Sequence, residues 1–128
     1  MSFSWRDYYI LAGQLKQQAA DSPQQEAYLR SAISRAYYAS FCLARNYLRD
    51  SLGRKSTGTL DDHEFVKNQF RNLPGQDNQA IAENLRRLRA YRNQADYDDE
   101  LPSIKNTALM AMNMAGKVIE TLEKFANP

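Results

Sequence analysis

Residues 28–48 read "YLRSAISRAYYASFCLARNYL", and this stretch predicts the fold. Placed on a helix, its apolar residues form two separate groups. The main stripe comprises Leu29, Ile33, Ala36, Tyr37, Leu43, Ala44 and Tyr47, and a second side carries Tyr28, Ala32, Ala39 and Cys42. A helix that is apolar on two sides is covered on two sides. The stretch is therefore either the central helix of a bundle or the helix through which two copies of the chain meet.

Short connections rich in Gly, Pro, Ser and Asp divide the rest of the chain into further helices. Ser22 is placed to cap the second helix, Pro23 to occupy its first position and Gly53 to stop it. We expect helices after Ser4, from Pro23 to about Leu52, over residues 61–70, over residues 78–97, and from near Pro102 onward. The sequence therefore predicts an all-α fold, an antiparallel bundle of four long helices and one short one, as a single domain over residues 1–128.

Composition narrows the class of protein. Seventeen Lys and Arg against fifteen Asp and Glu leave a net charge of only +2, so bulk charge points to neither a nucleic acid nor a membrane. The only cysteine, Cys42, has no intrachain partner for a disulfide, which suits a reducing compartment. The sequence has neither an apolar run of about 18 residues nor a signal-peptide pattern. We therefore expect a cytoplasmic protein with no membrane association.

Arg92 is the unusual residue of the helix predicted over residues 78–97. It falls in the middle of the apolar stripe formed by Ile81, Leu85, Leu88 and Ala95. A guanidinium cannot shed its charge, so at a buried position it needs a carboxylate, carbonyl groups or a bound anion such as phosphate. Asp96 lies one turn later, Arg89 one turn earlier, and Asn93 is adjacent. Residue chemistry alone favours a structural Arg92–Asp96 pair, because structural ion pairs outnumber active sites.

The stretch "SAISRAYYASF", residues 31–41, places the polar residues Ser40, Arg35 and Tyr38 beside apolar neighbours. Ser40 lies inside the main stripe, where we expect its hydroxyl to donate to a carbonyl one turn earlier. Arg35 and Tyr38 lie on the second side of the helix. They are candidates to line the cleft that Arg92 faces.

His63 is the only histidine, and a single histidine makes neither a metal site nor a catalytic pair by itself. The neighbouring carboxylates Asp61, Asp62 and Glu64 are explained by the acidic first turn that a helix dipole favours. The sequence therefore predicts no metal site, and it contains no glycine-rich phosphate loop. We expect no cofactor.

The order of three motifs resembles a known family. "SAISRAYYASF", then "DDHEFVKNQF" at residues 61–70, then "LRAYRNQADYD" at residues 88–98 resemble the HEPN domains of bacteria and archaea. The closest likeness is to small stand-alone proteins with "SRAYYA" and "RN-x-ADY" signatures, and it extends from about residue 5 to residue 125. The resemblance implies a helical bundle that dimerises.

The same resemblance implies a link to RNA. Many HEPN domains are metal-independent ribonucleases, often toxins paired with a nucleotidyltransferase antitoxin. In catalytic members an arginine, followed four to six residues later by a histidine, grips the scissile phosphate while the histidine moves the 2′-hydroxyl proton. Arg92 and Asn93 match "RN", and Asp96 and Tyr97 match "DY". No histidine follows Arg92, so the resemblance implies binding ahead of cleavage.

Three functional hypotheses follow. The first is a homodimer whose arginine-lined cleft binds RNA, a nucleotide or a partner protein in a toxin–antitoxin or defence module. The second is a metal-independent endoribonuclease toxin, and the third is a purely structural interaction module. The candidate catalytic residues are Arg92 and Asp96, and the candidate binding residues are Arg89, Asn93, Tyr97, Arg35, Tyr38 and His63.

Overall fold

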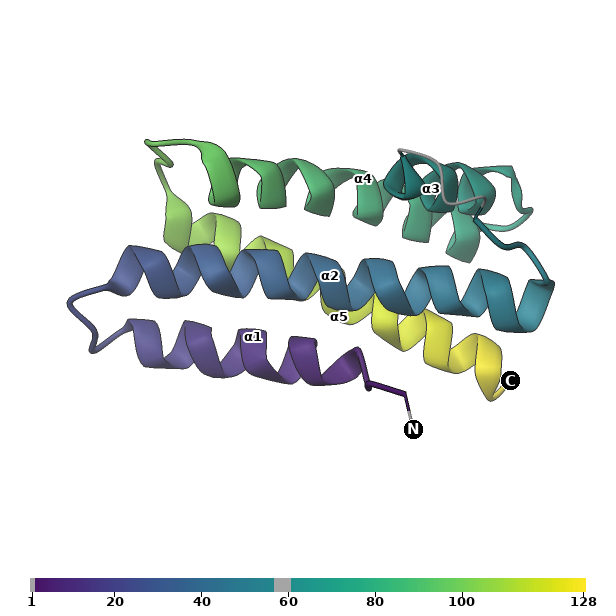
Figure 1. The fold of residues 1–128 in the computed structure, drawn as a ribbon, viewed down its shortest axis with the longest axis horizontal. Helices are drawn as coiled ribbons and strands as arrows, with labels where there is room; N and C mark the ends of the chain where they lie inside the picture. The colour runs from purple at the N-terminus through teal and green to yellow at the C-terminus, as the bar shows by residue number, and fades with distance from the viewer. Residues whose placement is uncertain (1, 57–60) are drawn as a thin grey trace.

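The computed structural model describes residues 2–56 and 61–128, and the regular structure of these residues is entirely helical (Figure 1). The expected all-α fold is confirmed. The helices are α1 (Arg6–Ala19), α2 (Gln25–Leu52), α3 (Asp62–Asn72), α4 (Gln76–Tyr97) and α5 (Ile104–Ala126). Four are long and α3 is short, as expected.

Helix α2 is the central helix of the bundle. It contacts each of the other four helices, and Figure 1 shows α1 along one side of it and α4 along the other. Both of its apolar sides are buried, Ile33 and Tyr37 on the main stripe and Ala32 and Ala39 on the second. This arrangement is the first of the two alternatives that the two-sided pattern allowed.

Two predicted helix starts are wrong by two residues. Helix α2 begins at Gln25 and not at Pro23, because the Ser22 hydroxyl accepts a hydrogen bond from the Gln24 N–H (3.0 Å) and closes a turn ahead of the helix. Helix α4 begins at Gln76 and not at residue 78, directly after Gly75, whose φ of 98° suits glycine. The predicted stop at Gly53 is confirmed, since this residue is left-handed with φ 65°.

Arg30 of α2 fastens the C-terminal end of α4. Its Nη1 donates to the carbonyl oxygens of Ala95 (3.1 Å) and Asp98 (2.6 Å), while its Nε donates to Glu26 (3.0 Å). The last carbonyls of a helix have no partner within the helix, so a cation that binds them both satisfies and anchors them. Arg30 therefore holds the turn of α4 that carries Asp96.

Candidate functional site

Arg92 is buried, with 8% of its surface exposed, between α2 and α4. Its guanidinium carbon lies 5.6 Å from the ring centre of Tyr37 and 5.4 Å from that of Tyr38. Its Nη1 lies 3.6 Å from Asp96 Oδ2, and its Nε has no hydrogen-bond partner among the described residues. The guanidinium therefore packs on two aromatic rings and makes one long ion pair.

Arg89 and Arg92 face different carboxylates. Arg89 Nη2 lies 3.4 Å from Asp61, the N-cap of α3, and Nη1 lies 3.3 Å from Glu64 in the first turn of that helix. Asp96, for its part, accepts a hydrogen bond from the Ser34 hydroxyl of α2 (3.4 Å). The constellation of Arg89, Arg92 and Asp96 predicted from spacing is therefore brought together only for Arg92 and Asp96.

His63 is tied to the same region from α3. Its Nδ1 shares a hydrogen bond with the Tyr37 hydroxyl, and its ring stacks on Phe41 with ring centres 4.3 Å apart. Burial, and then the positive charges of Arg89 and Arg92, lower the pKa of His63 below its usual 6.5. Burial also raises the pKa of Tyr37. At neutral pH the imidazole is therefore neutral, and the phenol keeps its proton.

A hollow of about 290 Å³ lies between α2, α3 and α4. Tyr37, Phe41, His63, Arg89 and Asn93 are among the side chains that line it. Arg92 does not itself line the hollow, but its guanidinium packs on the Tyr37 ring, and we call the hollow together with Arg92 the arginine cleft. It combines cationic groups with aromatic surface and one imidazole, which are the groups that can bind a phosphate and stack on a base.

Comparison with known proteins agrees with this architecture. The model of the family described as the HEPN domain matches residues 12–125, which include every residue of the arginine cleft. The chain belongs to the HEPN domain family. No curated protein and no solved structure matches it. The resemblance noted from the motifs of the sequence is thus confirmed for the family.

The remaining predicted site residues of this HEPN domain lie at different distances from Arg92. The Tyr38 ring contacts Arg92 directly. The Arg35 guanidinium carbon lies 5.6 Å from the centre of the same Tyr38 ring and 4.8 Å from the centre of the Tyr8 ring. Tyr97, at the end of α4, is 75% exposed. The structure therefore connects Arg35 to Arg92 through one ring and leaves Tyr97 at the surface.

Tyr37 and Phe41 line the arginine cleft but were not identified as site residues from the sequence. Tyr37 appeared there only as an apolar position on the main stripe of α2. The Tyr37 hydroxyl was the available signal, because a phenol on a buried stripe needs a hydrogen-bond partner. The sequence could not show that this partner is His63, which lies 26 positions away on another helix.

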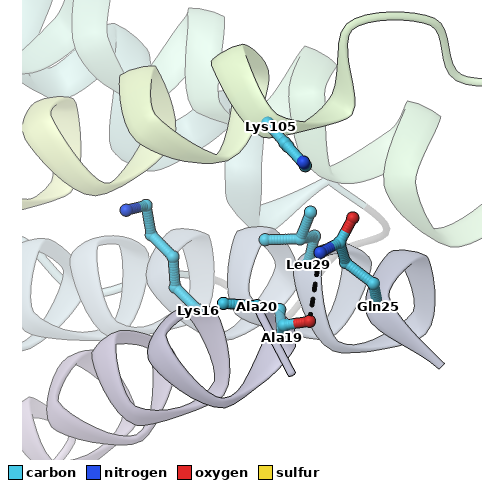
Figure 2. A pocket seen from close by; sticks show the side chains of 6 residues that line it. All are labelled: Lys16, Ala19, Ala20, Gln25, Leu29 and Lys105. Carbon is cyan, nitrogen blue, oxygen red and sulfur yellow. Dashed lines mark hydrogen bonds between the residues drawn. The ribbon is translucent and has the colours of Figure 1, made fainter. Parts of the chain in front are cut away.

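A second hollow, of about 280 Å³, lies where the end of α1 meets the starts of α2 and α5. Figure 2 shows Lys16 of α1 and Lys105 of α5 at its edges, with Leu29 and Gln25 of α2 beside them. The Gln25 side-chain amide donates to the Ala19 carbonyl (3.2 Å). Its described lining includes no histidine, cysteine or carboxylate, so it lacks the groups that usually carry acid–base chemistry.

Potential metal ligands do not cluster in the part of the HEPN domain that the structure describes. Within residues 2–56 and 61–128, no group of three or more His, Cys, Asp and Glu is arranged to hold a metal ion. Over the same residues, no helix has both the length and the apolar character that crossing a bilayer requires.

Proposed function

We propose that this HEPN domain is a cytoplasmic homodimer that binds single-stranded RNA through the arginine cleft. One observation carries the proposal: Arg92 is buried and held by the rings of Tyr37 and Tyr38, yet its nearest carboxylate oxygen is 3.6 Å away. A guanidinium positioned by rings keeps most of its charge available to an anion. The phosphates of RNA supply that anion.

The groups around Arg92 favour RNA over a simple anion. Arg89 and Asn93 line the cleft as further polar contacts, and His63 and Phe41 present stacked aromatic surface beside them. Proteins that recognise RNA commonly combine cations for the backbone with aromatic or imidazole rings for unstacked bases. The Arg92–Asp96 contact, at 3.6 Å, is longer than a hydrogen bond, so a phosphate oxygen can compete with the carboxylate for the guanidinium.

The test is the affinity of the purified protein for a fluorescent uridylate dodecamer, measured by anisotropy. We expect Arg92→Met to abolish binding and Arg6→Met to retain it. Arg6 is a suitable control because it loses the same charge from an exposed ion pair with Glu123. Retained binding in Arg92→Met would refute the proposal and would favour the purely structural role. Sedimentation equilibrium tests the homodimer, and a monomer would count against that part.

A second candidate function is metal-independent ribonuclease activity. The observation that favours it is His63, because an imidazole lies in the same hollow as Arg89 and is held there by the Tyr37 hydroxyl. Its lowered pKa leaves it neutral at pH 7, which suits a general base acting on a 2′-hydroxyl. Asp96 is less suited, because it does not line this hollow and its Oδ2 already lies against the Ser34 hydroxyl and Arg92.

The ribonuclease candidate predicts cleavage of RNA in EDTA, with a 2′,3′-cyclic phosphate at the new end. His63→Gln should remove cleavage while leaving dodecamer binding intact, whereas Arg92→Ala should remove both. Cleavage that persists in His63→Gln would exclude the assigned base. Binding without any cleavage by the unaltered protein would leave the RNA-binding function alone.

The toxin–antitoxin role is a further part of the proposal. It rests on family membership, because HEPN domains are often related to nucleases or toxin–antitoxin modules. We expect a nucleotidyltransferase-type antitoxin as the protein partner. Co-expression of the chain with the product of an adjacent nucleotidyltransferase gene, followed by co-purification, tests this role.

A further inference from the structure

A third hollow, of about 350 Å³, lies between the C-terminal part of α2 and α3. The charged side chains that line it are Arg45, Arg49, Arg54, Lys55 and Asp62. In the described part of the chain this hollow thus gathers four cations around one carboxylate. Since the whole chain carries a net charge of only +2, this is a local concentration of positive charge. We call it the basic hollow.

Two of these arginines are positioned without being neutralised. The Arg45 guanidinium carbon lies 5.6 Å from the ring centre of Trp5 and 6.0 Å from that of Phe41. Arg54 Nη1 donates to the Gln69 side-chain oxygen (2.9 Å). Within residues 2–56 and 61–128, neither arginine lies in an ion pair. Rings and an amide therefore orient these cations while leaving their charge for an anion.

Other arginines of the chain differ in this respect. Arg86 donates to both carboxylate oxygens of Glu83 (3.0 and 2.6 Å), and Arg49 donates to both oxygens of Asp50 (2.7 and 3.1 Å). These carboxylates already occupy the fork of N–H donors that would bind a phosphate. Within residues 2–56 and 61–128, the cations of the basic hollow that form no ion pair are thus Arg45, Arg54 and Lys55.

The basic hollow adjoins the arginine cleft across the first turn of α3. Asp62 lines the basic hollow, and the next residue, His63, lines the arginine cleft. Phe41 also joins them, because its ring contacts the Arg45 guanidinium and stacks on His63. A chain of phosphates that leaves the arginine cleft across the first turn of α3 therefore meets Arg45, Arg54 and Lys55.

We propose that the basic hollow is a second phosphate-binding subsite, which extends the path of a single-stranded RNA from the arginine cleft around the first turn of α3. The inference rests on the proposed function, because it assigns a second contact to the same ligand. Contacts to phosphates carry no base specificity, but they set the register and the length of strand that is bound. A short RNA fills the arginine cleft alone, and a longer one also reaches the basic hollow.

The test compares two double variants that each remove two positive charges from the full-length protein. Arg54→Gln/Lys55→Gln alters the basic hollow. Lys16→Gln/Lys105→Gln alters the hollow of Figure 2, whose lysines likewise form no ion pair in the described residues. Leu29 and Leu48 line the respective hollows and lie 19 residues apart on α2, roughly 28 Å, so the control site is well beyond a Debye length.

The measurement is the salt dependence of binding to a uridylate dodecamer and to a uridylate trimer. The logarithm of the binding constant falls as the logarithm of the salt concentration rises, and each phosphate contact of a single strand adds about 0.7 to the steepness of this fall. Loss of two contacts therefore makes the slope shallower by about 1.4. We expect that loss for the dodecamer in Arg54→Gln/Lys55→Gln, and no change for the trimer. The control variant should keep the original slope for both RNAs.

Each other outcome overturns the inference in a distinct way. An equal loss of slope in both double variants would mean that net charge alone is responsible. An unchanged slope in Arg54→Gln/Lys55→Gln, with binding still abolished by Arg92→Met, would remove the second subsite but keep the RNA-binding function. Absence of dodecamer binding by the unaltered protein would remove both proposals together.

Discussion

Arg92 Nη1 lies 3.6 Å from Asp96 Oδ2, which makes an ion pair longer than a hydrogen bond. Both groups have other partners: Arg92 lies against two tyrosine rings, and Asp96 accepts from Ser34. Both residues belong to α4, so the pair lies along one helix and meets α2 through the two rings and Ser34. The length of this ion pair underlies the first prediction.

We expect Arg92→Met to change the free energy of unfolding by no more than about 1 kcal/mol, because methionine fills the space between the rings and removes a buried N–H group without a partner. Arg92→Ala should cost about 2–4 kcal/mol through lost packing. Urea unfolding monitored by circular dichroism measures both. If methionine destabilises the protein as much as alanine does, the Arg92–Asp96 pair is structural.

The stability of the protein should decrease as the pH falls below about 6.5. Because burial and then Arg89 and Arg92 depress the pKa of folded His63, the unfolded chain binds the proton more readily. The free energy of unfolding is therefore highest above pH 6.5 and falls as the pH decreases through the lowered pKa. Urea titrations between about pH 5 and 8, where carboxylates stay charged, measure this slope.

His63 is the only histidine, so His63→Gln serves as the control for that slope. The variant should show a flat dependence over the same pH range. A slope of equal size in His63→Gln would mean that another group is responsible.

Arg30→Ala should destabilise the protein by about 1–3 kcal/mol, because it leaves carbonyl groups at the end of α4 without their charged donor. Arg86→Ala is the matched control. It removes an exposed pair with Glu83, for which less than about 1 kcal/mol is expected. Hydrogen exchange should also accelerate in the last turn of α4 in Arg30→Ala. Equal effects of the two variants would show that the Arg30 contacts add no stability.

Gly116→Ala should destabilise the contact between α1 and α5. A Cβ at Gly116 would lie 2.7 Å from the Tyr9 hydroxyl oxygen, and that hydroxyl donates to the Met112 carbonyl (3.2 Å). Alanine favours a helix by about 1 kcal/mol over glycine, and the clash opposes this gain. In a Tyr9→Phe background the clash is relieved, so Gly116→Ala should become less destabilising or stabilising there. Additive effects in this double-mutant cycle would contradict the close approach of Tyr9 to Gly116.

Several site features were predictable because they depend on neighbours along one helix. The apolar stripe of α4 placed Arg92 at a buried position, and the spacing of one turn placed Asp96 beside it. The Ser40 hydroxyl donates to the Ala36 carbonyl (3.1 Å), as its place on the stripe predicted. Helical geometry sets each of these relationships, so a single sequence is enough to infer them.

Other features depend on how separate helices pack, and spacing along the chain carries no information about them. Arg89 has the right spacing to join Arg92 and Asp96. However, α3 packs against α4, and Asp61 and Glu64 at the start of α3 pair with Arg89 instead. Likewise, His63 acquires a role only because α3 brings it against Tyr37 and Phe41 of α2.

Helix periodicity thus determined the all-α class, the two apolar sides of α2 and the buried position of Arg92, because these follow from local geometry and the burial of apolar side chains. Tertiary packing alone decided that Arg92 lies between two rings, that His63 shares its cleft, and that Arg45, Arg54 and Lys55 gather beside it. The physical reason is that contacts between distant residues depend on side-chain packing across helix interfaces, which no periodic pattern within one helix encodes.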